Sequence, residues 1–261
     1  MKWIGTSWKM NHLRADSRAY ANSFMSQISD LDLRGIQPFI LPPVTSLDIL
    51  VDLLGEGTNL LLGVQNAHWA KSGAWTGEIS MSMVADAGAS LIEIGHAERR
   101  ANFGETDRVV NLKVKSALAN DLRPLLCVGE PEEVFEAGGA TEYVLEQLWG
   151  AFGGVEDFSS VLIAYEPVWA IGDLGRVPAP EDVAAVLEAL QMAVGAGQSD
   201  PSQRAQAVLF GGSLNPENAT AFLDLPGTDG LFIGRAARTA DGFVEILRRV
   251  AGSISDSEER I

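Results

Sequence analysis

One carboxylate in this sequence is well placed to act as a base. Residues 161–164 form a short apolar run that predicts a buried strand. Glu166 follows this run closely and precedes Pro167, which cannot continue a central strand. With Trp169 nearby, Glu166 is a candidate general base. An isolated acid of this kind is more often a solvated charge at a strand end, so the rest of the pattern has to decide its role.

Polar residues and glycines follow other apolar runs in the same way. Lys9 comes after the first run, His96 after the fourth, a Gly-Gly-Ser stretch at 211–213 after the seventh, and Gly234 after the eighth. A lone histidine or lysine is usually structural or solvated, and a glycine pair is usually a turn. Such features at the ends of several apolar runs are hard to explain as independent accidents.

The chemistry of these groups is mutually consistent. Glu166 can remove a proton, Lys9 can stabilise negative charge, and His96 can donate a hydrogen bond to a carbonyl oxygen. The glycines after the seventh and eighth runs offer unobstructed backbone N–H groups to a phosphate. The set predicts proton abstraction next to a carbonyl group in a small phosphorylated sugar.

Eight apolar, β-rich runs alternate with stretches that predict helices. The predicted strands span residues 3–6, 37–41, 59–64, 90–94, 122–127, 161–165, 205–210 and 230–233, and the clearest predicted helices span 17–28, 107–119, 141–152, 181–194 and 242–250. This alternation over 261 residues is typical of an α/β fold, a single closed (β/α)8 barrel with its site where the strands end. A doubly wound open sheet is the alternative. We expect one domain over residues 1–261, with about 254–261 as a frayed acidic tail.

Composition narrows the expected partners and compartment. The formal net charge of −16 repels phosphate backbones, so nucleic acid is not an expected partner. The sequence has no apolar run of membrane-spanning length and no leader-like segment at its start, so no membrane partner is expected. Cys127 is the single cysteine, which excludes an internal disulfide and favours a reducing, cytoplasmic location.

Six segments, in order along the chain, resemble motifs of the triosephosphate isomerase family. They are Trp8-Lys9-Met10-Asn11, residues 73–80, Gly95-His96 with Glu98-Arg99-Arg100, residues 103–106, the segment 164–172 around Glu166, and Gly211-Gly212-Ser213. The resemblance covers essentially the whole chain. It implies the barrel fold, isomerisation of a sugar phosphate through an enediolate, a homodimer, and neither a metal nor an organic cofactor.

The resemblance also implies roles for individual residues. Glu166 would shuttle a proton between adjacent carbons, His96 would be a neutral electrophile, and Lys9 would stabilise the enediolate. The implied substrate-binding residues, most of them acting through backbone N–H groups on the phosphate, are Ser7, Gly172, Ser213, Gly234 and Arg235.

Further residues would support the site. Glu98 would be a partner of Lys9, and Cys127 would be a small buried residue beside the site. Residues 172–176 would belong to a lid. Thr76 would reach into the site of the neighbouring subunit, which is the basis for expecting a homodimer.

Several positions depart from the family pattern. Ser7 stands where the family has an asparagine whose amide donates to the substrate, so a donor is lost and volume is gained. Phe210 replaces a tyrosine that latches the lid, and Arg235 replaces a glycine and adds a positive group near the phosphate. The changes at Ser7 and Arg235, together with His68 and Trp69, resemble a branch of the family that acts on four-carbon erythrulose (tetrulose) phosphates in sugar-alcohol catabolism.

Two other functions are consistent with parts of the pattern. A triosephosphate isomerase that interconverts glyceraldehyde 3-phosphate and dihydroxyacetone phosphate in glycolysis would use the same Glu166, His96 and Lys9. The lost asparagine and tyrosine argue against an enzyme tuned for the triose alone. A non-catalytic phosphate-binding protein on the same scaffold is disfavoured, because base, electrophile and lysine are all present.

Overall fold

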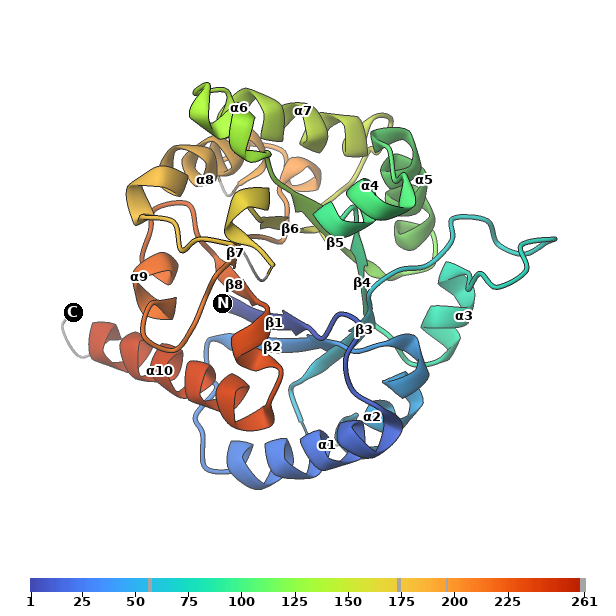
Figure 1. Cartoon of the computed structure of the whole chain (residues 1–261), viewed down its shortest axis with the longest axis vertical. Helices are drawn as coiled ribbons and strands as arrows, with labels where there is room; N and C mark the ends of the chain where they lie inside the picture. The colour runs from blue at the N-terminus through green and yellow to red at the C-terminus, as the bar shows by residue number, and fades with distance from the viewer. Residues whose placement is uncertain (56–57, 173–174, 196, 259–261) are drawn as a thin grey trace.

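Eight parallel strands close into a barrel (Figure 1). The computed structural model describes residues 1–55, 58–172, 175–195 and 197–258. The strands follow one another in sequence order, and β1 pairs in parallel with both β2 and β8. They are β1 (Lys2–Ser7), β2 (Ile36–Leu41), β3 (Leu61–Val64), β4 (Leu91–Ile94), β5 (Arg123–Val128), β6 (Leu162–Tyr165), β7 (Ala207–Gly212) and β8 (Gly230–Ile233). Closure between β1 and β8 confirms the predicted (β/α)8 barrel and excludes the open sheet.

Helices surround the barrel (Figure 1). In the described ranges they are α1 (Arg14–Ile28), α2 (Leu47–Leu54), α3 (Met81–Asp86), α4 (Ala97–Phe103), α5 (Asp107–Leu118), α6 (Glu132–Glu136), α7 (Ala140–Phe152), α8 (Pro180–Val194), α9 (Ala219–Leu223) and α10 (Ala240–Glu258). The sequence predicted α1, α5, α7, α8 and α10. It missed the five shorter helices, because eight residues or fewer span too few turns for a helical period to show. Residues 254–258 continue α10 where a frayed tail was expected, and 259–261 lie outside the described ranges.

Alternate strand residues fill the interior of the barrel. The inner cluster consists of Trp3, Phe39, Leu41, Leu91, Leu125, Cys127, Leu162, Ala164, Ala207, Leu209 and Phe232. Large and small residues are matched across it: a Cβ built on Gly5 would stand 2.0 Å from ring atom Cζ of Phe39. The interior is therefore packed, and a ligand can bind only at an open end of the barrel.

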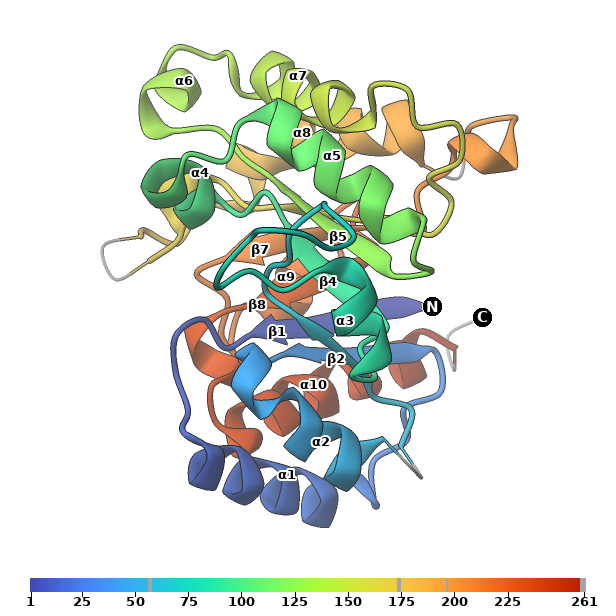
Figure 2. The ribbon, with the colours of Figure 1, turned by 90° about the vertical axis from the view of Figure 1, so that its right-hand side faces the viewer.

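The chain segment between β3 and α3 projects from the rest of the molecule (Figures 1 and 2). Residues 65–80 extend outward beyond the ring of helices, and residues 71–78 are exposed. Figure 2 shows the barrel from the side, with the N-terminus at the end of the barrel where β1 begins. Within the described ranges, none of the helices has both the length and the apolar character needed to cross a membrane.

Candidate active site

Glu166 lies directly after β6, and two glycines make its position accessible. Its backbone N–H donates to the Val128 carbonyl at 2.8 Å, and its side chain is 9% exposed. A Cβ on Gly211 would stand 2.6 Å from Glu166 Cγ, and one on Gly129 would stand 1.9 Å from the Glu166 carbonyl oxygen. Glycine at both positions is therefore required for this placement of the carboxylate at the strand ends.

His96 is the N-cap of α4, directly before its first residue, and its imidazole points toward Glu166. Its Nδ1 accepts a hydrogen bond from the Glu98 N–H at 3.1 Å, which assigns the ring hydrogen of the neutral form to Nε2. Nε2 lies 3.6 Å from Glu166 Oε2. The ring thus presents an N–H donor to the same space that the candidate base faces.

Lys9 brings positive charge to this space. Its backbone adopts a left-handed conformation with φ of 54°, which is uncommon for a residue with a side chain and typical of functional sites. Its Nζ donates to Glu98 Oε1 at 2.5 Å. Burial opposes the charged form, but the hydrogen bond to Glu98 and the nearby carboxylates of Glu166 and Glu93 raise the pKa of Lys9 above its usual value. The ammonium group therefore stays charged at neutral pH.

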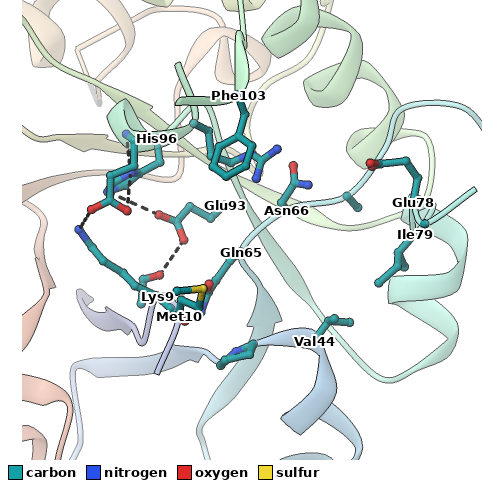
Figure 3. Close-up of a pocket in the computed structure, with 16 residues that line it drawn as sticks. Lys9, Met10, Val44, Gln65, Asn66, Glu78, Ile79, Glu93, His96 and Phe103 are labelled. Atoms are coloured by element: carbon teal, nitrogen blue, oxygen red, sulfur yellow. Dashed lines mark hydrogen bonds and ion pairs between the residues drawn. The ribbon is translucent and has the colours of Figure 1, made fainter. Parts of the chain in front are cut away.

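Glu93 is a buried acid that the sequence analysis did not single out. It lies in the middle of β4, between Ile92 and Ile94, with its side chain 4% exposed. Its Oε2 accepts a hydrogen bond from Ser7 Oγ at 2.8 Å, and its Oε1 lies 4.0 Å from His96 Nε2. Figure 3 shows the carboxyl group directed toward His96, away from the strand. The alternation of β4, with Leu91 inside the barrel, was the signal that could have identified it.

The environment of Glu93 predicts a pH-dependent cost in stability. Burial, together with the carboxylate of Glu166, raises its pKa from 4.5 to about 7, although His96, Ser7 and Lys9 oppose the shift. The folded protein then holds a proton that the unfolded chain releases, so the contribution of this group to stability is full below about pH 4.5 and is lost as the pH rises to about 7.

We therefore expect Glu93→Gln to unfold at higher urea concentration than the wild type at pH 8. The difference should be about 1–3 kcal/mol at pH 8 and should shrink toward pH 5, because a glutamine has no proton to lose. Urea unfolding at pH 5, 6, 7 and 8 measures it. If the free energies of unfolding of the two proteins depend on pH in the same way, the pKa of the Glu93 carboxyl is not raised in the folded protein.

A cavity of about 620 Å³ lies between β1, the segment after β6, and the ends of β7 and β8. Its lining includes Gly172, Ser213, Gly234 and Arg235, four residues that the sequence analysis assigned to substrate binding. Glu166 also lines it. An Arg235 guanidinium nitrogen donates to the Gly172 carbonyl at 3.0 Å, so this side chain spans the rim. We call this the first cavity.

Trp169, which precedes the expected lid, and Arg176, the last residue of that lid, contact each other after the end of β6. Trp169 Nε1 donates to Glu130 Oε1 at 2.8 Å, and the Arg176 guanidinium lies over the Trp169 ring at 4.3 Å from its centroid. Phe210 is fully buried, so it fills space where the family's tyrosine would present a hydroxyl. Of the expected lid, residues 173 and 174 lie outside the described residues.

A second cavity of about 410 Å³ opens on the side of β3 and β4 (Figure 3). Glu93 and His96 line it, with exposed apolar side chains of Met10, Val44 and Phe103 at its mouth. The first and second cavities share Ser7, Lys9 and Glu98 in their linings. They therefore meet at the candidate catalytic residues.

Two of the predicted site residues, Thr76 and Cys127, line neither of the two cavities. Thr76 is exposed on the projecting loop and lines neither cavity of its own chain. Cys127 is buried inside the barrel, where burial, Glu166 and Glu93 raise the pKa of its thiol well above the usual range. Among the described residues, no three His, Cys, Asp or Glu side chains gather in a way that could hold a metal ion.

The chain is similar to known proteins over nearly its whole length. Residues 2–250 match the model of the family described as triosephosphate isomerase. The chain is 46% identical over 251 residues to the L-erythrulose-1-phosphate isomerase of Mycolicibacterium smegmatis, covering 95% of this chain and 93% of that protein. It is 46% identical over 255 residues to the enzyme of the same name from Mesorhizobium japonicum, covering 97% and 98%.

A solved structure is similar at the level of the whole fold. The crystal structure of triosephosphate isomerase from Bartonella henselae aligns with a TM-score of 0.83 at 33% identity, covering 95% of this chain and 98% of that one. Sequence and structure therefore point to the same family, and the relatives with the higher identities carry the name of a four-carbon isomerase.

Proposed function

This chain belongs to the triosephosphate isomerase family and is an isomerase, and from that premise we propose that its substrate is L-erythrulose 1-phosphate. The observation that carries the choice of substrate is the 46% identity, over nearly the full length of both chains, to two enzymes named for that compound. The loss of the asparagine donor at Ser7 supports the same choice. We place the reaction in sugar-alcohol catabolism.

The structure of the substrate determines where the proton moves. L-Erythrulose 1-phosphate has its phosphate on C1, its ketone on C2, a hydroxyl on C3 and a terminal hydroxymethyl group, C4. Glu166 removes the hydrogen of C3, and the electrons of that C–H bond form an enediolate across C2 and C3. The proton returns to C2, and a proton passes from the oxygen of C3 to that of C2. The product has its ketone at C3, which is erythrulose 4-phosphate when numbered from the other end.

Lys9 and His96 stabilise the enediolate in this proposal. The ammonium of Lys9 faces the developing negative charge, and the Nε2–H of His96 donates to the substrate oxygens and can relay a proton between them. The first cavity receives the phosphate, held by backbone N–H groups of Gly172, Ser213 and Gly234 with the Arg235 guanidinium beside them. The proton transfers of this route use the side chains of Glu166 and His96 and require neither a metal nor an organic cofactor.

We also propose that the enzyme is a cytoplasmic homodimer. Trp75 and Thr76 are exposed on the projecting loop. The mouth of the second cavity is apolar, as is the Trp75 side chain. Insertion of this loop into the second cavity of another copy would bury both. A solution mass twice that of the chain, measured by light scattering, is the expected result; a monomer would remove this part of the proposal.

A substrate panel tests the proposed reaction. We expect kcat/KM to be at least about 10-fold higher for L-erythrulose 1-phosphate than for dihydroxyacetone phosphate or glyceraldehyde 3-phosphate, the selectivity that one added group can give. Erythrulose 4-phosphate, the substrate of the reverse reaction, should be turned over as well. Faster turnover of the trioses would identify a triosephosphate isomerase instead, and turnover of none would favour a phosphate-binding protein.

A further inference from the structure

We propose that Glu93, together with Ser7, binds the terminal hydroxyl group of the four-carbon substrate and so selects it over three-carbon sugar phosphates. The inference rests on the proposed function and adds a specificity residue to it. It starts from the position of Glu93, a buried acid whose carboxyl group accepts one hydrogen bond from the described residues, that of Ser7, and faces the candidate catalytic residues.

The arrangement of the two cavities fixes which end of the substrate faces Glu93. The phosphate cradle of Gly172, Ser213 and Gly234 lines the first cavity, whereas Glu93 lines the second. The candidate catalytic residues lie between them, because the two cavities meet at Lys9. A linear substrate with its phosphate in the first cavity and its reacting carbons beside Glu166 therefore directs its far end into the second.

The difference between the two substrates lies at that far end. In the proposed reaction C3 loses its hydrogen, and C4, a hydroxymethyl group, is attached to C3 on the side away from the phosphate. The corresponding carbon of a triose phosphate ends the chain and carries no such group. The second cavity must therefore hold one more carbon and one more hydroxyl when the four-carbon substrate binds.

The Glu93 carboxyl group is suited to that hydroxyl. Oε2 accepts a hydrogen bond from Ser7 Oγ at 2.8 Å, while Oε1 is 4.0 Å from His96 Nε2, beyond hydrogen-bond distance. Oε1 is therefore available to a ligand that reaches past His96. A carboxylate accepts from a hydroxyl group, and a protonated carboxyl can also donate to it, so either form can bind the substrate.

Burial makes this interaction selective. The Glu93 side chain is 4% exposed, so water forms few hydrogen bonds with its carboxyl group. A substrate without the terminal hydroxyl leaves Ser7 as the hydrogen-bond partner and therefore binds less tightly than one that has this hydroxyl. A site that hydrogen-bonds a substrate hydroxyl discriminates strongly against an analogue that lacks it. Ser7 contributes in two ways. Its hydroxyl holds the carboxyl group in place, and its short side chain lines the second cavity beside Glu93.

The test compares Glu93→Leu with Glu93→Gln in the full-length enzyme. For Glu93→Leu, kcat/KM for L-erythrulose 1-phosphate should fall by about 10- to 100-fold, the contribution of a hydrogen bond to a charged group. The inhibition constant of dihydroxyacetone phosphate, which lacks the hydroxymethyl group, should change by less than about threefold. Glu93→Gln keeps an acceptor and a donor and should recover most of the lost activity. Ser7→Ala should lie between the two.

Several outcomes would overturn the inference. If Glu93→Leu lowers kcat/KM and raises the inhibition constant of dihydroxyacetone phosphate by the same factor, while it melts at the wild-type temperature, Glu93 supports the site as a whole and does not read the hydroxyl. If Glu93→Gln is as impaired as Glu93→Leu, the carboxyl group acts in proton transfer. If the wild type turns over L-erythrulose 1-phosphate and both variants match it, the inference alone fails, whereas a wild type inactive on this substrate overturns the proposed function with it.

Discussion

Replacement of Glu166 by glutamine is expected to lower kcat for L-erythrulose 1-phosphate by about 10³- to 10⁴-fold, at the upper end of what general-base catalysis contributes. Glutamine has nearly the same size, so it should fit between Gly129 and Gly211, but it cannot accept the proton from C3. KM should change little, because the phosphate cradle and Lys9 are untouched. Steady-state kinetics of the variant measure the loss.

Isotope exchange makes this test specific to the chemical step. In D2O the wild type should place deuterium on the carbon that is reprotonated, and Glu166→Gln should not. Glu98→Gln is a matched control, since it removes a carboxylate that bonds Lys9 at 2.5 Å and leaves the base in place. We expect it to lose less than about 10-fold, as expected for a partly exposed ion pair. Retention of exchange in Glu166→Gln would assign the base to another residue.

The fold could be predicted from the sequence because each strand carries its own signal. Short apolar runs bounded by Gly, Pro or polar residues gave all eight strands, and five helices were long enough to show their period. Short helices such as α4 and α6 could not be predicted, because tertiary packing and end-capping stabilise them rather than their own pattern. The number of strands favoured a closed barrel, and the pairing of β1 with β8 excluded the open sheet that the sequence left as the alternative.

The candidate site was partly predictable for a different reason. Parallel strands bring their carboxyl ends together, so Lys9, His96 and Glu166 could be assigned to one rim without coordinates. Glu93 was missed because it lies inside an apolar strand and not at its end. What an acid does at such a position depends on its neighbours across the barrel. Ser7 is 86 positions away in sequence, and only the closed structure shows that it donates to Glu93.

Glu105 is a residue outside both cavities whose loss is expected to cost much stability. It follows α4, is buried, and accepts hydrogen bonds from both Arg99 and Lys113. Burial opposes its charge, but these two cations hold the pKa of the Glu105 carboxyl below its usual value. Lys113 is itself buried and also donates to Asn66 Oδ1 at 2.5 Å, so the cluster ties α4 and α5 to the segment after β3.

Glu105→Gln should lower the free energy of unfolding by about 3–5 kcal/mol, because it leaves the buried ammonium of Lys113 without its counter-charge. Urea unfolding at pH 7 measures this loss.

Glu245→Gln is the matched control: Glu245 also pairs with two cations, Arg248 at 2.9 Å and Arg249 at 2.8 Å, but on the exposed face of α10. Its midpoint should stay near that of the wild type, since exposed pairs contribute little. Equal losses of unfolding free energy in the two variants would show that burial of the Glu105 cluster does not increase its contribution to stability. A larger loss at Glu105 would show that the buried cluster contributes strongly to the stability of the fold.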